Sequence, residues 1–207
     1  MPGSGKTTCA NMLSDRLTAR GIPNRCIPEL EENHPLIFYG LNFQDYLGSE
    51  AEQDELIRLI RDRYRAFVRE RLEAAEAVTI IESVMLQDTI NILHHMGMDV
   101  GKLRDLASGL ARILEPLRPV LIYYYHLDTE AHWRFICGVR GNEWGPVSLR
   151  TDEEFRQAGE LWGGSQSFVR SFVDAWDIPK LVIENRDYRW DEYTRRIMPF
   201  IDEHTSA

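Results

Sequence analysis

The sequence predicts an α/β fold with a parallel sheet, because short apolar runs alternate with longer helical stretches along the chain. In the longest helical stretch, apolar side chains recur every three or four residues from Leu56 to Leu72. No repeat, low-complexity tract or linker interrupts the alternation, so we expect a single domain over residues 1–207. The predicted strands lie at 24–27, 77–81, 120–125 and 181–183, and the apolar run at 77–81 predicts a buried strand.

The other predicted elements complete this alternation. Residues Ala10, Leu13 and Leu17 share one face of a first helix, and Gly21 stands where a C-terminal cap belongs. Further along we expect a loop-like stretch at 33–48, helices at 87–95, 102–114 and 130–139, a loop at 140–145, a helical stripe of Phe168, Phe172 and Trp176, and a terminal amphipathic helix that ends near Pro199.

Length, composition and charge narrow the class of protein. The chain has 207 residues, 43% of them hydrophobic, which suits a globular domain with a sizeable core. Its formal net charge of −9 argues against nucleic acid as a partner, because nucleic-acid binding usually needs a basic face. The three scattered cysteines form no disulfide framework, so we expect a cytoplasmic protein. No apolar run approaches about 18 residues and no signal peptide is visible, so no membrane is expected.

The first eight residues contain the most informative motif, which matches the end of the phosphate-binding loop G-x-x-x-x-G-K-[ST]. Successive backbone N–H groups can wrap a phosphate there, and the N-terminus of the following helix attracts the same anion. Lys6 would place its charge on the β- and γ-phosphates, and the Thr7 hydroxyl would ligate Mg²⁺. The predicted phosphate-binding residues are Gly3, Ser4, Gly5, Lys6, Thr7 and Thr8.

The start of this motif is incomplete in the sequence. The first glycine of the motif would fall one position before Met1, and no strand precedes the loop. The alternative interpretation is a Gly/Ser-rich tail that matches by chance. A strand and its glycine would need about ten residues upstream, so we expect the natural protein to start earlier. Without them, unpaired backbone groups would leave the chain poorly soluble or inactive.

The order of these parts resembles the P-loop kinases of the nucleoside and nucleotide kinase group, which includes thymidylate kinases. The resemblance covers nearly the whole chain and implies a single P-loop kinase-like domain with the P-loop NTPase fold. That fold has a parallel sheet of order 2-3-1-4-5 flanked by helices. By resemblance the predicted strands are the second, third, fourth and fifth, and strand 1, the central one, is missing from this chain.

The resemblance also implies roles for two acidic positions. An acid after the third strand helps to hold Mg²⁺, and Glu82 occupies that place, although Ser83 follows it where the family often has arginine. An acid after the second strand meets the acceptor hydroxyl; Glu29 matches, with Glu31 and Glu32 close behind. Glu82 would end a strand at the carboxyl edge of the sheet, where open α/β folds bind ligands.

Two further segments match the family by position. After the fourth strand the family has a helical lid, which we place at about 128–146, and Arg134 and Arg140 would reach the transferred phosphoryl group from it. Arg134 can equally pair with Glu130 one helical turn away. After the fifth strand a loop packs on the adenine; the matching residues are Asn185, Arg186 and Asp187.

These assignments predict an enzyme that moves the γ-phosphoryl group of ATP, with Mg²⁺, to a small acceptor such as a nucleoside or nucleotide. The sequence does not decide the acceptor and leaves a homodimer open. One alternative is a nucleotide-binding ATPase or switch module, although the N-K-x-D string of GTPases is absent. Another is an inactive product of a misplaced start. Acceptor-dependent ATP consumption distinguishes a kinase from a switch.

Overall fold

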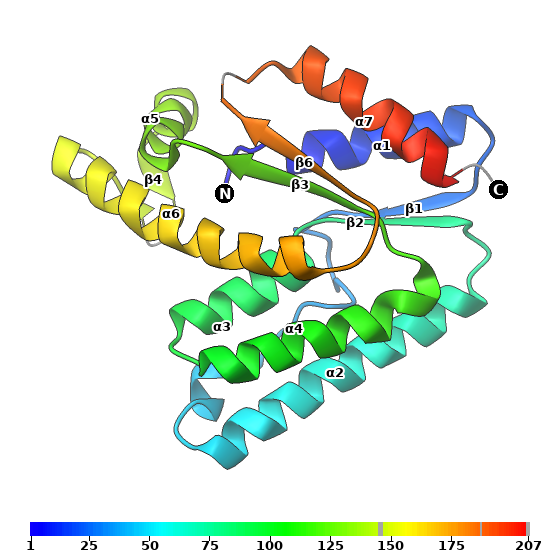
Figure 1. The fold of residues 1–207 in the computed structure, drawn as a ribbon, viewed down its shortest axis with the longest axis horizontal. Coiled ribbons are helices and arrows are strands. Elements are labelled where there is room, and N and C mark those ends of the chain that lie inside the picture. Colours follow the sequence, from blue (N-terminus) through cyan, green and yellow to red (C-terminus); the bar gives the residue numbers. More distant parts are fainter. Residues whose placement is uncertain (145–146, 187, 206–207) are drawn as a thin grey trace. The chain divides into compact units, whose positions relative to one another are not determined.

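Figure 1 shows the fold in a computed structural model, which describes residues 1–144, 147–186 and 188–205. These residues fall into two units. Unit 1 comprises Met1–Gly5, Leu121–Val173 and Pro179–Ala207, and unit 2 comprises Lys6–Val120 and Asp174–Ile178. The N-terminal loop therefore belongs to unit 1, and the helix that follows it in sequence begins unit 2.

A two-stranded parallel sheet forms part of unit 2. Strand β1 pairs with β2 in a register that sets Asn24 opposite Val78 and Ile27 opposite Ile81. Helix α1 packs against both strands through the apolar face that the sequence predicts. The elements of unit 2 are α1 (Lys6–Ala19), β1 (Asn24–Ile27), η1 (Phe43–Tyr46), α2 (Glu50–Glu73), β2 (Val78–Ile81), η2 (Val84–Asn91), α3 (Ile92–His95), α4 (Val100–Leu114) and η3 (Glu115–Leu117).

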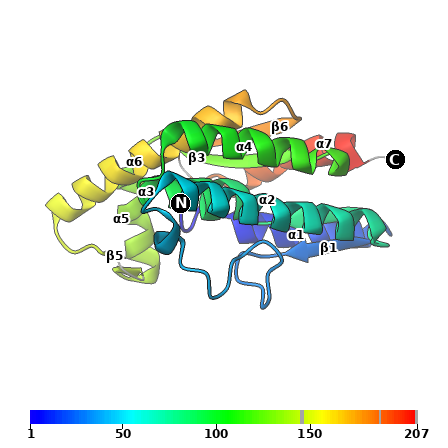
Figure 2. The ribbon, with the colours of Figure 1, turned by 90° about the horizontal axis from the view of Figure 1, so that it is seen from below.

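Helices α2 and α4 lie side by side and form much of the core of unit 2 (Figures 1 and 2). Helix α2 begins earlier than its apolar periodicity suggests, because the Ser49 hydroxyl accepts a hydrogen bond from the Glu52 amide and caps the helix. The Asp99 side chain caps α4 in the same way at the amide of Lys102. The fully buried core side chains of the two helices are Leu56, Ile60 and Tyr64 from α2 and Leu103, Leu106 and Leu110 from α4.

Unit 1 contains a second two-stranded parallel sheet, in which β3 pairs with β6 from Leu121 opposite Lys180 to His126 opposite Asn185. Helix α7 packs against β6, and the Gln166 side chain of α6 holds the end of β3 by exchanging two hydrogen bonds of 2.7 Å with the His126 backbone. The elements are β3 (Leu121–His126), α5 (Thr129–Arg140), β4 (Glu143–Trp144), β5 (Val147–Ser148), α6 (Asp152–Ala175), β6 (Lys180–Asn185) and α7 (Trp190–Thr205).

The α/β class and the parallel pairing of strands are confirmed, whereas the order 2-3-1-4-5 stays a prediction because each parallel sheet has two strands among the described residues. The prediction of a buried strand at 77–81 is wrong, since every residue of β2 is half-buried. One reason is that β2 pairs only with β1 in the part of the chain that the structure describes.

Three element boundaries also differ from the predictions. The stretch expected as a loop at 140–145 contains β4, which pairs antiparallel with β5; residues 145–146 lie outside the described part. Helix α7 continues past Pro199, whose exposed ring is tolerated within the helix. The predicted helix at 87–95 begins at Val84 as a π-helix. None of the described helices is long and apolar enough to cross a membrane.

Candidate functional site

The first turn of α1 meets the carboxyl end of β2 within unit 2. Lys6, Thr7 and Thr8 open the helix, and the Thr7 hydroxyl donates a hydrogen bond of 2.7 Å to Glu82 Oε1. Glu82 directly follows β2 and is only 5% exposed. A hydroxyl that donates its proton to a carboxylate keeps its oxygen lone pairs available for a cation. The two residues that the sequence assigns to Mg²⁺ therefore lie together.

Glu29, which follows β1, joins the same group. Its backbone N–H donates to Glu82 Oε2 at 3.3 Å. Its side-chain oxygens accept hydrogen bonds of 3.1 Å each from the Ser83 hydroxyl and from Gln87 Nε2. The parallel register explains this meeting, since β1 and β2 end at paired residues and their following side chains leave the sheet at one edge.

The neighbouring acids of Glu29 lie in other surroundings. Glu31 pairs with Arg25 at 2.8 Å, and Glu32 is exposed. Of the three acids that the sequence offers for the acceptor, the structure therefore brings Glu29 to Glu82. A carboxylate has about four lone-pair positions, so the two hydrogen bonds to Glu29 fix its orientation and leave it able to accept another donor.

The turn after Glu82 has an unusual backbone that aims side chains at Glu29. Ser83 adopts φ 69° and ψ −20°, in the left-handed region that disfavours residues with a Cβ. The π-helix η2 follows, and the Ser83 carbonyl accepts hydrogen bonds from the amides of both Gln87 and Asp88. Strained residues and π-helical turns concentrate at functional sites, and here they accompany the placement of Gln87 against Glu29.

Asp88 adds a third carboxyl group to this site. Its Oδ2 atom is buried and has no hydrogen-bond partner among the described residues. Burial, reinforced by the negative charge of Glu29, raises the pKa of Asp88 to about 7, against the opposing effect of the Lys6 ammonium. The site therefore combines one ammonium group with three carboxyl groups, of which Asp88 exchanges a proton near neutral pH.

The N-terminal loop in unit 1 has the backbone that its glycines allow. Gly3 and Gly5 adopt φ 66° and 86°, values that other residues rarely take. A Cβ on Gly3 would lie 1.9 Å from Ile136 Cδ1, and a Cβ on Gly5 would lie 2.6 Å from Trp190 Cζ3. Both glycines are thus required by conformation and by close packing against α5 and α7.

A buried histidine fixes the start of this loop. His132 Nε2 lies 2.7 Å from the Pro2 carbonyl oxygen, and its Nδ1 lies 2.9 Å from the Tyr188 hydroxyl. Because a carbonyl only accepts, Nε2 carries a proton, and in the neutral ring Nδ1 accepts from Tyr188. Burial raises the pKa of Tyr188 to about 12, so this phenol keeps its proton. Ser4, 2% exposed, donates to the Met1 carbonyl at 2.8 Å.

The remaining predicted site residues make contacts within unit 1. Arg134 pairs with Glu130 at 2.8 Å, as its alternative interpretation anticipates. It also pairs with Asp152 at 2.8 Å, which the sequence does not predict. Arg140 is exposed at the end of α5.

The predicted adenine loop follows β6 in unit 1. The buried Asn185 Oδ1 accepts hydrogen bonds from the Tyr188 amide and the Tyr193 hydroxyl. Arg186 lies 3.4 Å from Glu184, and Asp187 lies outside the described residues. The roles of the arginines and of this loop stay predictions.

Among the described residues, no group of three or more His, Cys, Asp or Glu side chains could hold a metal ion. The oxygen ligands at this site do not suggest a metal ion that is held by protein side chains alone. Mg²⁺ keeps several waters and takes one or two protein oxygens together with substrate phosphates. Thr7 Oγ1 and a Glu82 carboxylate oxygen are hard ligands of this kind, and they fit such a site.

Sequence reasoning missed Gln87 and Asp88 at the Glu29 site and His132 and Tyr188 at the N-terminal loop. A helical period of 3.6 residues does not reveal a π-helix, and nothing in the sequence links His132 to Pro2.

Comparison of the chain with protein-family models gives no match, and comparison with curated proteins gives none either.

Proposed function

We propose that this protein is an ATP-dependent phosphotransferase that uses Mg²⁺ and moves a γ-phosphoryl group to a small hydroxyl or phosphate acceptor. The hydrogen bond of 2.7 Å between Thr7 and Glu82 is the observation that carries the proposal. It connects the Gly-Lys-Thr sequence to the acid after β2, the pairing that the resemblance to P-loop kinases of the nucleoside and nucleotide group implies. A P-loop NTPase sheet of order 2-3-1-4-5 is part of this proposal.

Different residues of the chain would bind the phosphates and the Mg²⁺ ion during phosphoryl transfer. Lys6 and the amides at the start of α1 hold the phosphates through charge and through the positive end of the helix. Thr7 and Glu82 would hold Mg²⁺, which neutralises phosphate charge when it is bound. Phosphoryl transfer needs little covalent help from a protein, so positioning of these groups accounts for most of the catalysis.

Glu29 is the proposed base for the acceptor. Ser83 and Gln87 hold its carboxylate in one orientation, and it can accept the proton of an acceptor hydroxyl. The acceptor oxygen forms a bond to the γ-phosphorus as the bond from that phosphorus to the bridging oxygen breaks. ADP leaves with the electron pair of that bond, and the acceptor proton passes to Glu29.

Three variants of the full chain test the proposal. Lys6→Ala should weaken ATP binding by about 10- to 150-fold in calorimetry, because a charge-assisted hydrogen bond contributes about 1.5–3 kcal/mol. Glu82→Gln should keep the melting temperature and lower Mg²⁺-dependent turnover by about 100-fold. Glu73→Gln, which neutralises an exposed acid on α2, is the control and should behave as the wild type.

The readout is ATP consumption with a panel of nucleosides, nucleotides and other hydroxyl compounds. An acceptor that speeds consumption in the wild type and not in Glu82→Gln supports a phosphotransferase. Consumption that no acceptor accelerates would leave an ATPase or switch instead. If the wild type binds neither ATP nor GTP in calorimetry, the proposal fails altogether.

A further inference from the structure

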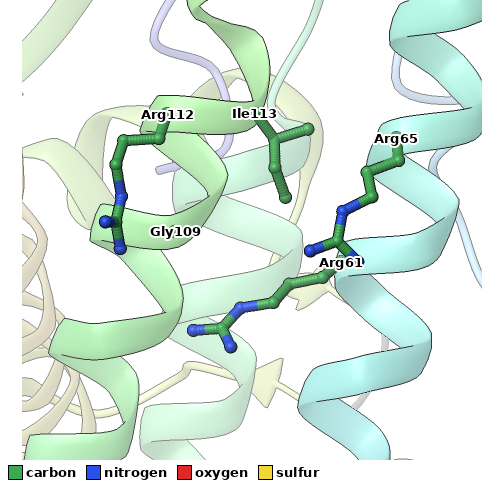
Figure 3. A pocket seen from close by; sticks show the side chains of 5 residues that line it. All are labelled: Arg61, Arg65, Gly109, Arg112 and Ile113. Carbon is green, nitrogen blue, oxygen red and sulfur yellow. The ribbon is translucent and has the colours of Figure 1, made fainter.

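Three arginines gather over a hollow between α2 and α4 in unit 2 (Figure 3). The cavity has a volume of about 270 Å³ and is lined by Arg61, Arg65, Gly109, Arg112 and Ile113. Arg61 and Arg65 come from α2, one helical turn apart, and Arg112 comes from α4. The lining contains three guanidinium groups and no acidic side chain, in a chain whose formal net charge is −9.

Arg61 is built into this hollow and does not extend along the solvent face of α2. Figure 3 shows it reaching across toward α4, where Nη2 donates to the Asp105 carbonyl at 3.0 Å. Gly109 makes room for it, since a Cβ at that position would lie 2.9 Å from Arg61 Nε. That Nε atom is buried and has no hydrogen-bond partner among the described residues. The Arg61 guanidinium therefore makes its hydrogen bond to a neutral backbone carbonyl.

Acidic side chains on the same two helices compensate part of the charge of the hollow. Asp62 accepts from Arg65 at 2.8 Å and also pairs with Arg58. Asp105 lines an adjoining hollow together with Asp54, and Asp54 pairs with Lys102. Arg112 Nε donates a hydrogen bond of 3.4 Å to the Ser108 carbonyl. Two of the three guanidinium groups in the lining thus make hydrogen bonds to neutral carbonyls.

We propose that this hollow, the arginine pocket, binds a phosphate-bearing small molecule. Guanidinium groups have five donors in a planar fork that matches phosphate oxygens, and several of them together favour an anion with more than one charge. The net negative charge of the chain disfavours an extended polyanion, whereas a compact anion can bind within a lining that has no acidic side chain. The pocket is separate from the Lys6–Glu82 site and does not depend on the proposed phosphotransferase activity.

Calorimetry with inorganic pyrophosphate as the probe tests the pocket in the full chain. Lys6→Ala serves as the background, because it removes the charge of the phosphate-binding loop. In that background we expect saturable binding that weakens by about tenfold, or about 1.4 kcal/mol, when Arg112→Gln or Arg65→Gln is added. Arg69→Gln, which removes an exposed arginine of α2 outside the pocket, should change nothing.

Gly109→Ala provides a second variant that should not endanger folding. Alanine is favoured over glycine inside a helix, and here its Cβ would displace only the flexible tip of Arg61. We expect weaker pyrophosphate binding by about fivefold or more from loss of one charge-assisted contact. Gly164→Ala, in α6 with open space around its Cβ, is the matched control.

Several results would overturn the proposal. Absence of saturable pyrophosphate binding would do so, as would binding that Lys6→Ala abolishes or that the arginine and glycine variants leave intact. Binding to vesicles containing phosphatidic acid, without binding to free pyrophosphate, would assign the pocket to a membrane and contradict a small-molecule site. If ATP turnover fails while pyrophosphate binding persists, the proposed function is lost and the pocket stands.

Discussion

Replacing Asp88 by asparagine should stabilise the fold at alkaline pH and leave it nearly unchanged in acid. In the folded chain burial and the charge of Glu29 raise the pKa of Asp88 from 3.8 to about 7, and Lys6 only partly offsets them. Ionised Asp88 is therefore unfavourable in the native state. Asparagine has a similar shape and no charge at any pH, so the variant removes that unfavourable term.

The sign follows from proton linkage. Between about pH 4 and pH 7 the native state holds a proton on Asp88 that the unfolded chain has lost. The contribution of Asp88 to stability therefore falls as pH rises through this window, and it is constant above about pH 7. A shift of about three pKa units corresponds to at most about 4 kcal/mol. Because the side chain is partly open to solvent, we expect about 1–3 kcal/mol.

Urea unfolding between pH 4.5 and pH 8.5 measures this effect. The difference in the free energy of unfolding between Asp88→Asn and the wild type should be about a quarter of its full value at pH 4.5 and reach about 1–3 kcal/mol in favour of the variant at pH 8.5. Other carboxyl groups titrate in both proteins and largely cancel. Asp15→Asn, at an exposed position on α1, should show no such pH-dependent difference.

Two results would refute this reasoning. A variant that is less stable than the wild type at pH 8.5 would mean that ionised Asp88 is held by attraction to Lys6. A difference that does not change with pH would mean that Asp88 titrates in the folded chain as it does in the unfolded chain.

Two further variants test the loop at the N-terminus of unit 1. Gly3→Ala should destabilise the fold by about 1–3 kcal/mol in urea unfolding, because φ at this position is 66° and the new Cβ would meet Ile136 Cδ1. Adding Ile136→Val should recover part of the loss. Full stability of the single variant would contradict the close packing of Gly3 against Ile136. Tyr188→Phe should cost about 0.5–1.5 kcal/mol because it removes the hydrogen bond of 2.9 Å between the Tyr188 hydroxyl and His132 Nδ1. An unchanged melting temperature would show that this hydrogen bond contributes nothing.

The periodicity of the sequence was sufficient to predict most elements of the fold. Apolar spacing locates α2 and α4, and the β-rich runs locate β1, β2, β3 and β6, because these patterns follow from burying one face of an element. The sequence pattern says less about which backbone hydrogen bonds form. The π-helix η2 follows Ser83, which has a left-handed conformation, and no glycine or proline from Ser83 to Asn91 marks the change.

Residues of the candidate site were predictable only where a motif or a position after a strand identifies them. Thr7 and Glu82 come from a motif and from a position after a strand, and the structure places them in contact. The positions of Gln87 and Asp88 depend on the turn after Glu82, so the sequence does not reveal that they approach Glu29. The sequence also does not reveal the position of Arg61, because the room for its side chain comes from Gly109 on another helix.

The charges at the Glu29 site explain why the proposed activity would need a divalent cation. Glu29 and Glu82 share a hydrogen bond, and the charges of both, with that of Lys6, act on Asp88, so a triphosphate approaching α1 meets three carboxyl groups and the Lys6 ammonium. The helix terminus contributes only about half a positive charge. Protonation of Asp88 near neutral pH removes one negative charge, and a divalent cation held by Thr7 and Glu82 would reverse the remaining balance. The affinity for nucleotide should therefore rise more steeply with Mg²⁺ concentration than it would if Lys6 were the only charged group at the site. This dependence should also be steeper at pH 8 than at pH 6.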